Sequence, residues 1–287
     1  MAGGPARLFP LLLALAALAG CSDLNTRHER GPETAEKAQW QWQTIKAGAF
    51  TFATAAAPEK KGRILTVYIE GDGFAYKTAM EPAMDPTPIT PMSLDLATRH
   101  PGSGPVAYLA RPCQFVERDA KTCPDIYWTT DRYAPVVIVS MSDAVDQLKA
   151  NAQASHVILV GYSGGGAVAT LLAERRNDVV GLVTIAANLD VAEWTRVKHL
   201  LPLAGSLDPA TDTSSLATTK QVHFHGTEDK TVPAAVTNSF MSKLPKGTPA
   251  TSVAVTDQTH QCCWADNWHD LATRPGVTAI DGWMRGD

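Results

Sequence analysis

A glycine-rich segment, Gly161-Tyr162-Ser163-Gly164-Gly165, constrains the fold more than any other part of this sequence. It follows a run of β-branched and aliphatic residues at 156–160 and precedes a stretch at 164–176 in which apolar residues recur with helical spacing. Glycines on both sides of a residue allow a turn tight enough to join a buried strand directly to a helix. We therefore expect a strand–turn–helix unit with the side chain of Ser163 exposed at the turn.

Short apolar runs alternate with helix-length stretches along most of the chain. The runs that predict buried strands are 64–69, 106–109, 156–160, 179–186, 222–224 and 252–255. The expected helices are 134–150, 164–176, 191–201, 234–243 and 277–284, and an antiparallel hairpin is expected from residue 41 to before Pro58. This alternation is typical of an α/β domain with a mostly parallel sheet and helices on both faces, which we assign to residues 41–287. Ligands of such sheets bind at the carboxyl ends of the strands.

A serine at this kind of turn can be a nucleophile only with the help of other side chains. Its hydroxyl is weakly nucleophilic at neutral pH, so it needs a histidine as general base and an acid behind the histidine. His260 follows the last expected strand, and Asp229 lies in a turn of the segment His225-Gly226-Thr227-Glu228-Asp229-Lys230-Thr231-Val232-Pro233. These two residues are the predicted base and acid. The alternatives are Asp190 or Glu228 as the acid and His269 as the base.

A second glycine-containing turn, Glu70-Gly71-Asp72-Gly73-Phe74, follows the expected strand 64–69. Backbone N–H groups at such a strand end can face a substrate and stabilise a developing oxyanion. The residue after the nucleophile, Gly164, begins a helix and offers a further N–H group. We expect Gly73 and Gly164 to form the oxyanion hole. Asp72 and Phe74 remain alternatives to Gly73.

These motifs together resemble a group of bacterial α/β-hydrolase proteins with lipoprotein-type N-termini. The resemblance covers roughly residues 60–285 and includes Ala187-Asn188-Leu189-Asp190 besides the three turns. It implies the α/β-hydrolase fold and a Ser-His-Asp triad that acts through an acyl-enzyme without a cofactor. Related enzymes usually have His-Gly where this chain has Glu70-Gly71. We expect a carboxylesterase that acts on small or lipid-like esters. The alternatives are a peptidase or amidase, a thioesterase, and a non-catalytic envelope lipoprotein that uses the fold as a scaffold.

The N-terminus has the features of a secretion signal. Arg7 precedes an unbroken apolar run at 8–19, which predicts a signal peptide over residues 1–20. Leu18-Ala19-Gly20-Cys21 resembles the lipobox of bacterial lipoproteins, which implies lipidation of Cys21 and anchoring to a membrane. Residues 21–40 are polar without hydrophobic periodicity, so we expect a flexible tether. The expected location is the cell envelope, at the outer membrane and facing the periplasm.

Four cysteines remain for an oxidising compartment once Cys21 is assigned to lipidation. They allow three pairings. Cys113 and Cys123 bracket a short charged segment, so a disulfide between them is the first expectation, and the vicinal residues Cys262 and Cys263 would then form the second. A disulfide so close to His260 would brace the histidine loop, and we expect its reduction to lower activity.

The charge of the chain excludes one class of partner. A formal net charge of −4 and a pI near 6.1, without any basic run, disfavour nucleic-acid binding. The expected partner is therefore a small or neutral substrate, which the resemblance implies to be a small-molecule ester, bound by a monomer. A metal site is a weaker alternative, because its candidate ligands match no familiar zinc spacing. Those candidates are His223, His225, His260, Cys262, Cys263 and His269.

One proline-rich segment, residues 80–104, interrupts the regular alternation. It contains prolines and methionines that favour a rigid, irregular cover beside the turn at residues 70–74 over a mobile helix. An ordinary surface excursion is the alternative. These residues are Met80, Pro82, Met84, Pro86, Pro88, Pro91, Met92 and Pro101, with Pro105 just beyond. Trp194, Trp264 and Trp268 lie near the acid and histidine segments and are candidates to line an apolar acyl pocket.

Overall fold

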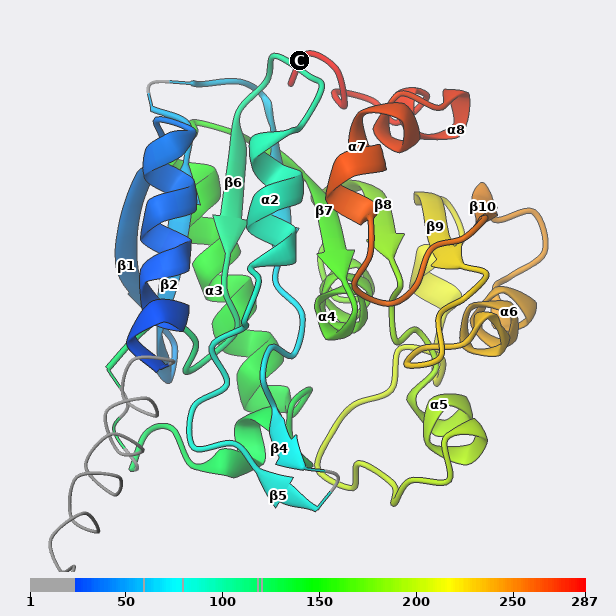
Figure 1. Ribbon diagram of the computed structural model, residues 1–287. Helices are drawn as coiled ribbons and strands as arrows, with labels where there is room; N and C mark the ends of the chain where they lie inside the picture. Colours follow the sequence, from blue (N-terminus) through cyan, green and yellow to red (C-terminus); the bar gives the residue numbers. More distant parts are fainter. Residues whose placement is uncertain (1–23, 59, 79, 118, 120) are drawn as a thin grey trace, which may run out of the picture.

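The computed structural model describes residues 24–287 except 59, 79, 118 and 120. The predicted signal peptide and the predicted lipidation site Cys21 lie outside the described residues. Figure 1 shows a central sheet with helices in front of it and behind it. No helix in the described part of the chain combines the length and the apolar character needed to cross a membrane.

The sheet has eight strands in the order β1-β2-β6-β3-β7-β8-β9-β10. The strands are β1 (Gln41–Ala47), β2 (Phe50–Ala56), β3 (Ile64–Ile69), β6 (Val106–Leu109), β7 (His156–Tyr162), β8 (Val179–Ile185), β9 (Lys220–Gly226) and β10 (Ala250–Val255). β1 and β2 form the expected antiparallel hairpin, and β2 also runs antiparallel to β6. All neighbours from β6 to β10 are parallel. The predicted mostly parallel sheet is therefore confirmed.

Both faces of the sheet are buried along its central strands, β6 to β9 in the sheet order, as their continuous apolar sequences require. In β3, Leu65 and Val67 pack into the hydrophobic cluster shared with α3 (Pro135–Asn151) and α4 (Gly164–Ala173). The alternate residue Tyr68 packs into the opposite cluster, shared with α2 (Met92–Thr98) and α7 (Trp264–Ala272). The remaining helices are α5 (Val191–Val197), α6 (Ala234–Lys243), α8 (Pro275–Thr278) and the 3-10 turns η1 (Asp125–Trp128) and η2 (Ser214–Leu216).

The prediction of a flexible tether over residues 21–40 is wrong for most of that segment. Residues 24–37 form a helix, which Figure 1 shows in blue beside the β1–β2 hairpin. Arg27, Gly31 and Ala35 are its buried positions, spaced four residues apart. At Gly31 a Cβ would lie only 2.5 Å from the ring of Trp42. The sequence did not predict this helix because two of its three buried positions are an arginine and a glycine, so it has no apolar stripe with helical spacing.

Two other expected segments differ from the structure. The helix expected over 277–284 is reduced to the single turn α8, which ends at Thr278, and the chain turns again at Gly282, whose φ is +79°. The proline-rich segment is less irregular than expected. It contains α2 and the short strand β5 (Glu81–Pro82). β5 pairs antiparallel with β4 (Tyr76–Thr78), which lies just before the segment. Both predicted cysteine pairs, Cys113–Cys123 and Cys262–Cys263, are disulfide-linked.

Candidate active site

Ser163 lies at the sharp turn between β7 and α4. Its φ of 54° and ψ of −125° are strained for a residue with a side chain. The flanking glycines make the turn possible. A Cβ at Gly161 would lie 2.3 Å from the Gly165 carbonyl oxygen, and a Cβ at Gly164 would lie 2.0 Å from the Asp72 carboxylate. The predicted strand–turn–helix unit is therefore present, with the serine at its apex.

The structure brings together the three residues predicted as the triad. The Oγ of Ser163 lies 2.9 Å from Nε2 of His260, and Nδ1 of His260 lies 2.8 Å from Oδ2 of Asp229. The side chain of Asp229 is completely buried, and that of His260 is 14% exposed. This chain of contacts holds the imidazole with one nitrogen toward the hydroxyl and the other toward the carboxylate. It is the arrangement in which a histidine can remove the proton from a serine.

The backbone around Asp229 fixes its carboxylate. Its Oδ1 accepts hydrogen bonds from the N–H groups of Thr231 and Val232, both at 2.8 Å. Oδ2 is left for the histidine. Both oxygens of the buried carboxylate are therefore hydrogen-bonded, which fixes its orientation toward the histidine.

The alternative acids and base lie elsewhere. Asp190 caps the N-terminus of α5 and binds the side chains of Ser239 and Lys243. Glu228 and His269 are exposed to solvent. These positions exclude all three from the hydrogen-bonded chain at Ser163.

The metal alternative finds no cluster in the described part of the chain. His223 is buried and contacts Thr184 and Gln221, whereas His225 contacts Ser252. Neither joins His260. Among the described residues no group of three or more histidine, cysteine or acidic side chains is placed to hold a metal ion.

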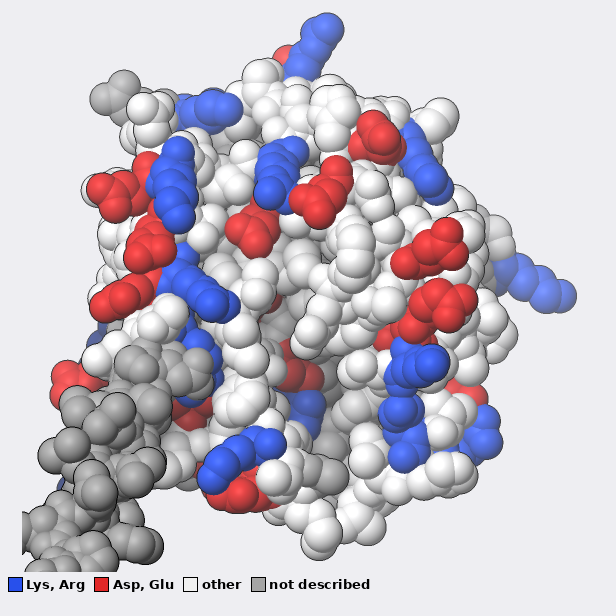
Figure 2. Space-filling model, viewed as in Figure 1, with Lys and Arg blue, Asp and Glu red and all other residues white. Residues whose placement is uncertain are grey.

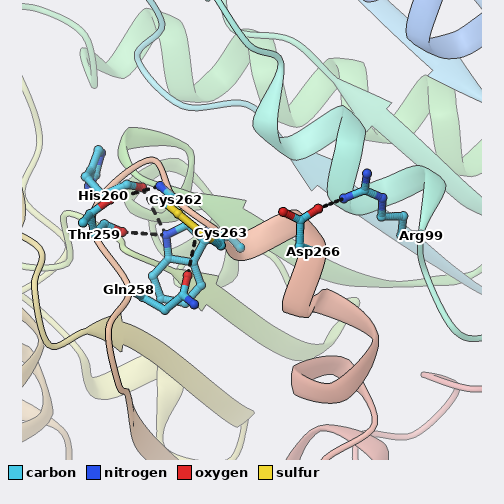
Figure 3. Close-up of a disulfide and its surroundings, with 8 residues drawn as sticks. Arg99, Gln258, Thr259, His260, Cys262, Cys263 and Asp266 are labelled. Carbon is cyan, nitrogen blue, oxygen red and sulfur yellow. Dashed lines mark hydrogen bonds and ion pairs between the residues drawn. A yellow bond between two sulfur atoms is a disulfide. The ribbon is translucent and has the colours of Figure 1, made fainter.

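The loop that contains His260 is tied down by a dense set of hydrogen bonds (Figure 3). The N–H of Cys262 donates to Oγ1 of Thr259, and the N–H of Cys263 donates to Oε1 of Gln258. The carbonyl of His260 accepts from Nε1 of Trp264 and also from the hydroxyl of Tyr162, the neighbour of the nucleophile. The loop is thus held both by its own side chains and by the nucleophile turn.

The loop after β3 lies against the nucleophile turn. Gly71 approaches Ser163 so closely that a Cβ at Gly71 would lie 3.3 Å from the serine Cβ. Gly73 has a φ of +69°, and its Cβ position is occupied by the carbonyl oxygen of Pro86.

Within the described residues, the N–H groups of Asp72 and Gly73 donate to no other group. Gly164 begins α4, so its N–H also lacks a partner within the helix. The oxyanion hole predicted at Gly73 and Gly164 stays a prediction, with Asp72 as an equally free donor.

A cavity of about 410 Å³ opens beside Ser163 and His260. Figure 2 shows a hollow near the centre of this face, with both acidic and basic atoms inside it. Its walls combine apolar side chains with a few polar ones. They are residues 70–76, Pro88, Ile89, Thr90, Met92, Arg132, Tyr162, Ser163, Asn188, Trp194, Thr231, Val232, His260 and Gln261. Trp194 lines the cavity as expected, whereas Trp264 and Trp268 are buried in the core.

Two buried arginines beside the cavity were not predicted from the sequence. Arg111 Nη1 donates to Oδ1 of Asp72 at 3.1 Å, and Arg132 Nη1 donates to Oδ2 at 2.7 Å. The hydroxyl of Tyr133 donates to the same carboxylate at 3.2 Å. Burial raises the pKa of Asp72, but the charges of Arg132 and Arg111 outweigh it and hold this pKa below its usual value. The only sequence signal was an acidic residue in the oxyanion turn, which needs a positive partner when buried.

Glu70 is buried in the cavity wall. Its carboxyl group accepts hydrogen bonds from the N–H of Gly71 at 2.9 Å and from the N–H of Ser93 at 3.2 Å. Ser93 is in the first turn of α2, so Glu70 joins the oxyanion turn to the start of that helix. Burial raises the pKa of Glu70 to about 7, against the effect of these hydrogen bonds.

Comparison with known proteins yields similarity in structure only. The sequence matches no protein-family model and no curated protein sequence. An esterase of Pyrococcus furiosus has a TM-score of 0.60 and 12% identity, covering 87% of this chain and 94% of its own. Est1E of Butyrivibrio proteoclasticus has a TM-score of 0.55 and 13% identity, covering 80% and 95%. A serine hydrolase involved in carbazole degradation has a TM-score of 0.52 and 18% identity, covering 81% and 96%. The chain therefore has the predicted α/β-hydrolase fold.

Proposed function

We propose that this protein is a serine hydrolase of the carboxylesterase type, with Ser163 as nucleophile, His260 as general base and Asp229 as the acid that orients the histidine. The observation that supports this most strongly is the continuous chain of hydrogen bonds from Ser163 through His260 to Asp229. Three α/β-hydrolase-fold neighbours described as an esterase, as Est1E and as a serine hydrolase agree with it.

The reaction proceeds in two halves. Ser163 Oγ attacks the ester carbonyl carbon while its proton moves to Nε2 of His260, and the carbonyl electron pair moves to the oxygen. Collapse of this tetrahedral species breaks the bond to the leaving oxygen, which takes the proton from His260 and departs as the alcohol. Water then attacks the acyl-enzyme with His260 again as base, which releases the carboxylic acid and restores Ser163. Backbone N–H groups of the oxyanion turn and of Gly164 stabilise the oxyanion.

We also propose that the chain is exported, lipidated at Cys21 and held at a cell-envelope membrane. The apolar run at 8–19 and the sequence Leu18-Ala19-Gly20-Cys21 support this proposal. Replacement of Cys21 by Ala should move the protein from the membrane fraction to the soluble fraction. An unchanged membrane fraction would contradict lipid anchoring.

The test of the proposed chemistry is labelling with a neutral fluorophosphonate probe, together with turnover of 4-nitrophenyl esters of graded acyl length. Wild type should be labelled and should turn over the esters, and Ser163→Ala should do neither. A matched serine, Ser239, hydrogen-bonds Asp190 away from the cavity, and Ser239→Ala should keep labelling. If folded wild type is not labelled and hydrolyses neither esters, thioesters nor amides, the protein is not a serine hydrolase.

A further inference from the structure

The strongest unexplained feature of the cavity is the guanidinium group of Arg132. Its side chain is only 6% exposed, yet Arg132 lines the cavity that opens at Ser163 and His260. A charged group this deeply buried is costly unless its N–H groups are satisfied. The role of Arg132 therefore depends on which acceptors its N–H groups meet.

The structure supplies acceptors for part of the guanidinium group. Nε donates to the carbonyl of Thr129 at 2.7 Å, and Nη1 donates to Asp72 at 2.7 Å. Within the described part of the chain, Nη2 donates to no acceptor. Nη2 is not one of the fully buried polar atoms without a partner among the described residues, so it keeps some accessible surface. Arg132 lines the cavity, so this surface is available to a ligand there. One edge of a rigidly held arginine is thus open toward the substrate space.

The charges around Asp72 do not cancel. Arg111 and Arg132 contribute two positive charges, and Asp72 contributes one negative charge, so the group has a net charge of +1. The other carboxyl group in the cavity wall, Glu70, binds the backbone N–H groups of Gly71 and Ser93 and neither arginine. One negative charge from a ligand would therefore balance the cluster.

The surroundings of Arg132 also favour a short, compact ligand. The indole of Trp194 lies beside the guanidinium group, with Cζ 5.8 Å from the ring centroid. The Asp72 carboxylate that Arg132 holds lies against Gly164, next to the nucleophile. An ester bound at Ser163 would therefore need only a few bonds to reach Arg132.

We infer that Arg132 is a specificity-determining residue and that the substrate is a short ester bearing a carboxylate, which pairs with the open edge of the Arg132 guanidinium group. This inference rests on the proposed function and names its substrate class. A guanidinium group binds a carboxylate through strong, directional hydrogen bonds, and burial strengthens the attraction. A carboxylate matches the single uncompensated charge.

The test compares anionic and neutral esters in wild type and Arg132→Gln. One pair places the charge in the acyl part: 4-nitrophenyl hydrogen glutarate against 4-nitrophenyl pentanoate. The other places it in the leaving group: 4-carboxyphenyl butyrate against 4-methylphenyl butyrate. In at least one pair, the anionic-to-neutral ratio of kcat/KM should fall by about tenfold or more in Arg132→Gln. Arg132→Lys, which keeps the charge without the planar fork, should give an intermediate ratio.

Arg111→Gln is the matched control. It removes the same charge from the Asp72 cluster, but Arg111 does not line the cavity. Its ratio should fall clearly less than that of Arg132→Gln, because Arg111 adds to the net charge of the cluster but makes no contact with a ligand in the cavity. Ratios that are unchanged in Arg132→Gln for both pairs, or that fall equally in Arg111→Gln, would overturn the inference. A preference for a phosphodiester-bearing ester over the carboxylate would do the same.

The failure of this inference is distinguishable from failure of the proposed function. Labelling of Ser163 by the neutral fluorophosphonate depends on the triad and not on Arg132. If labelling and all turnover are absent, calorimetric titration of glutarate into wild type and Arg132→Gln still tests the subsite. Binding that is weakened about tenfold by the substitution supports it, and equal or absent binding in both proteins overturns it.

Discussion

The two walls of the cavity are built in different ways. On one wall, Ser163, Asp229 and His260 lie on turns that follow β7, β9 and β10. Neighbouring N–H groups hold the Asp229 carboxylate, and the His260 loop is held by its own side chains and by the hydroxyl of Tyr162. The other wall, residues 71–92, contains little regular structure. It is held by distant residues: Arg27 donates to the carbonyls of Asp85 and Thr87, and Trp128 donates to that of Ala83.

We therefore expect the first wall to determine the catalytic step and the second wall to determine substrate binding. The triad wall inherits its geometry from the sheet, so substitutions there should remove catalysis and leave the fold largely intact. The opposite wall depends on contacts between segments about 60 residues apart in the chain. Substitutions in those contacts should lower stability and weaken substrate binding more than they slow the chemical step.

The largest expected effect is that of Asp229→Asn on the triad wall. The asparagine Oδ1 can still accept the N–H groups of Thr231 and Val232, so the loop keeps its shape. The histidine loses the carboxylate that orients and stabilises it, and kcat should fall by about 10³- to 10⁴-fold. Asp190→Asn is the control and should leave kcat within a few-fold. A larger loss in Asp190→Asn would reassign the acid to the earlier strand.

The next effect concerns Glu70, where the two walls meet. The pKa of this carboxyl group rises on folding from 4.5 to about 7. The folded protein therefore binds the proton more tightly, and the associated stability is complete below pH 4.5 and lost as pH rises through about 7. The shift corresponds to on the order of 3 kcal/mol. Glu70→Gln cannot titrate, so the wild-type stability relative to this variant should decrease between pH 4.5 and pH 8.

Urea unfolding at these two pH values measures this difference, with Glu81→Gln as an exposed control. The control should show no such change relative to wild type. An equal difference between wild type and Glu70→Gln at both pH values would mean that the carboxyl group does not titrate in this range in the folded protein.

A smaller effect is expected for Arg27→Met on the second wall. The variant loses two hydrogen bonds to buried carbonyls and the stacking of Arg27 over Phe74, whose ring centroid lies 4.8 Å from Cζ. The free energy of unfolding should decrease by about 2 kcal/mol. KM should rise severalfold while kcat changes little, because Phe74 lines the cavity. Lys37→Met on the same helix, where the side chain is 80% exposed, should behave as wild type. A fall in kcat without a change in KM would contradict the division between the walls.

The smallest effect on activity is expected in a comparison of the two disulfides. Replacement of both Cys262 and Cys263 by Ser loosens the loop of His260, so kcat/KM should fall roughly three- to tenfold because the base is less well positioned. Replacement of both Cys113 and Cys123 by Ser removes a link behind the second wall and should lower stability by about 2–3 kcal/mol. Esterase assays and urea unfolding of both double variants measure these effects. Full activity of the Cys262/Cys263 variant would show that its disulfide does not support the histidine.

The sequence by itself determined the sheet and the residues of the triad wall. A strand followed by Gly161-Tyr162-Ser163-Gly164-Gly165 leaves few geometries for the backbone, and parallel strands place their carboxyl ends at one edge. Asp229 and His260 follow two such strands, so their meeting with Ser163 follows from topology. Local turn chemistry was sufficient at each turn because it acts over a few residues, and the parallel strands then bring the three turns to one edge of the sheet.

Only the tertiary structure decided the second wall and the charges in it. A sequence does not distinguish a buried arginine from a solvated one, so neither Arg27 nor Arg132 stood out. The helix over residues 24–37 forms its contacts through Arg27 and Gly31 instead of an apolar stripe. The pairing of Asp72 with Arg132 joins residues 60 positions apart. Such contacts depend on how the loops pack over the sheet, and that packing is decided by the shape and polarity of the whole fold.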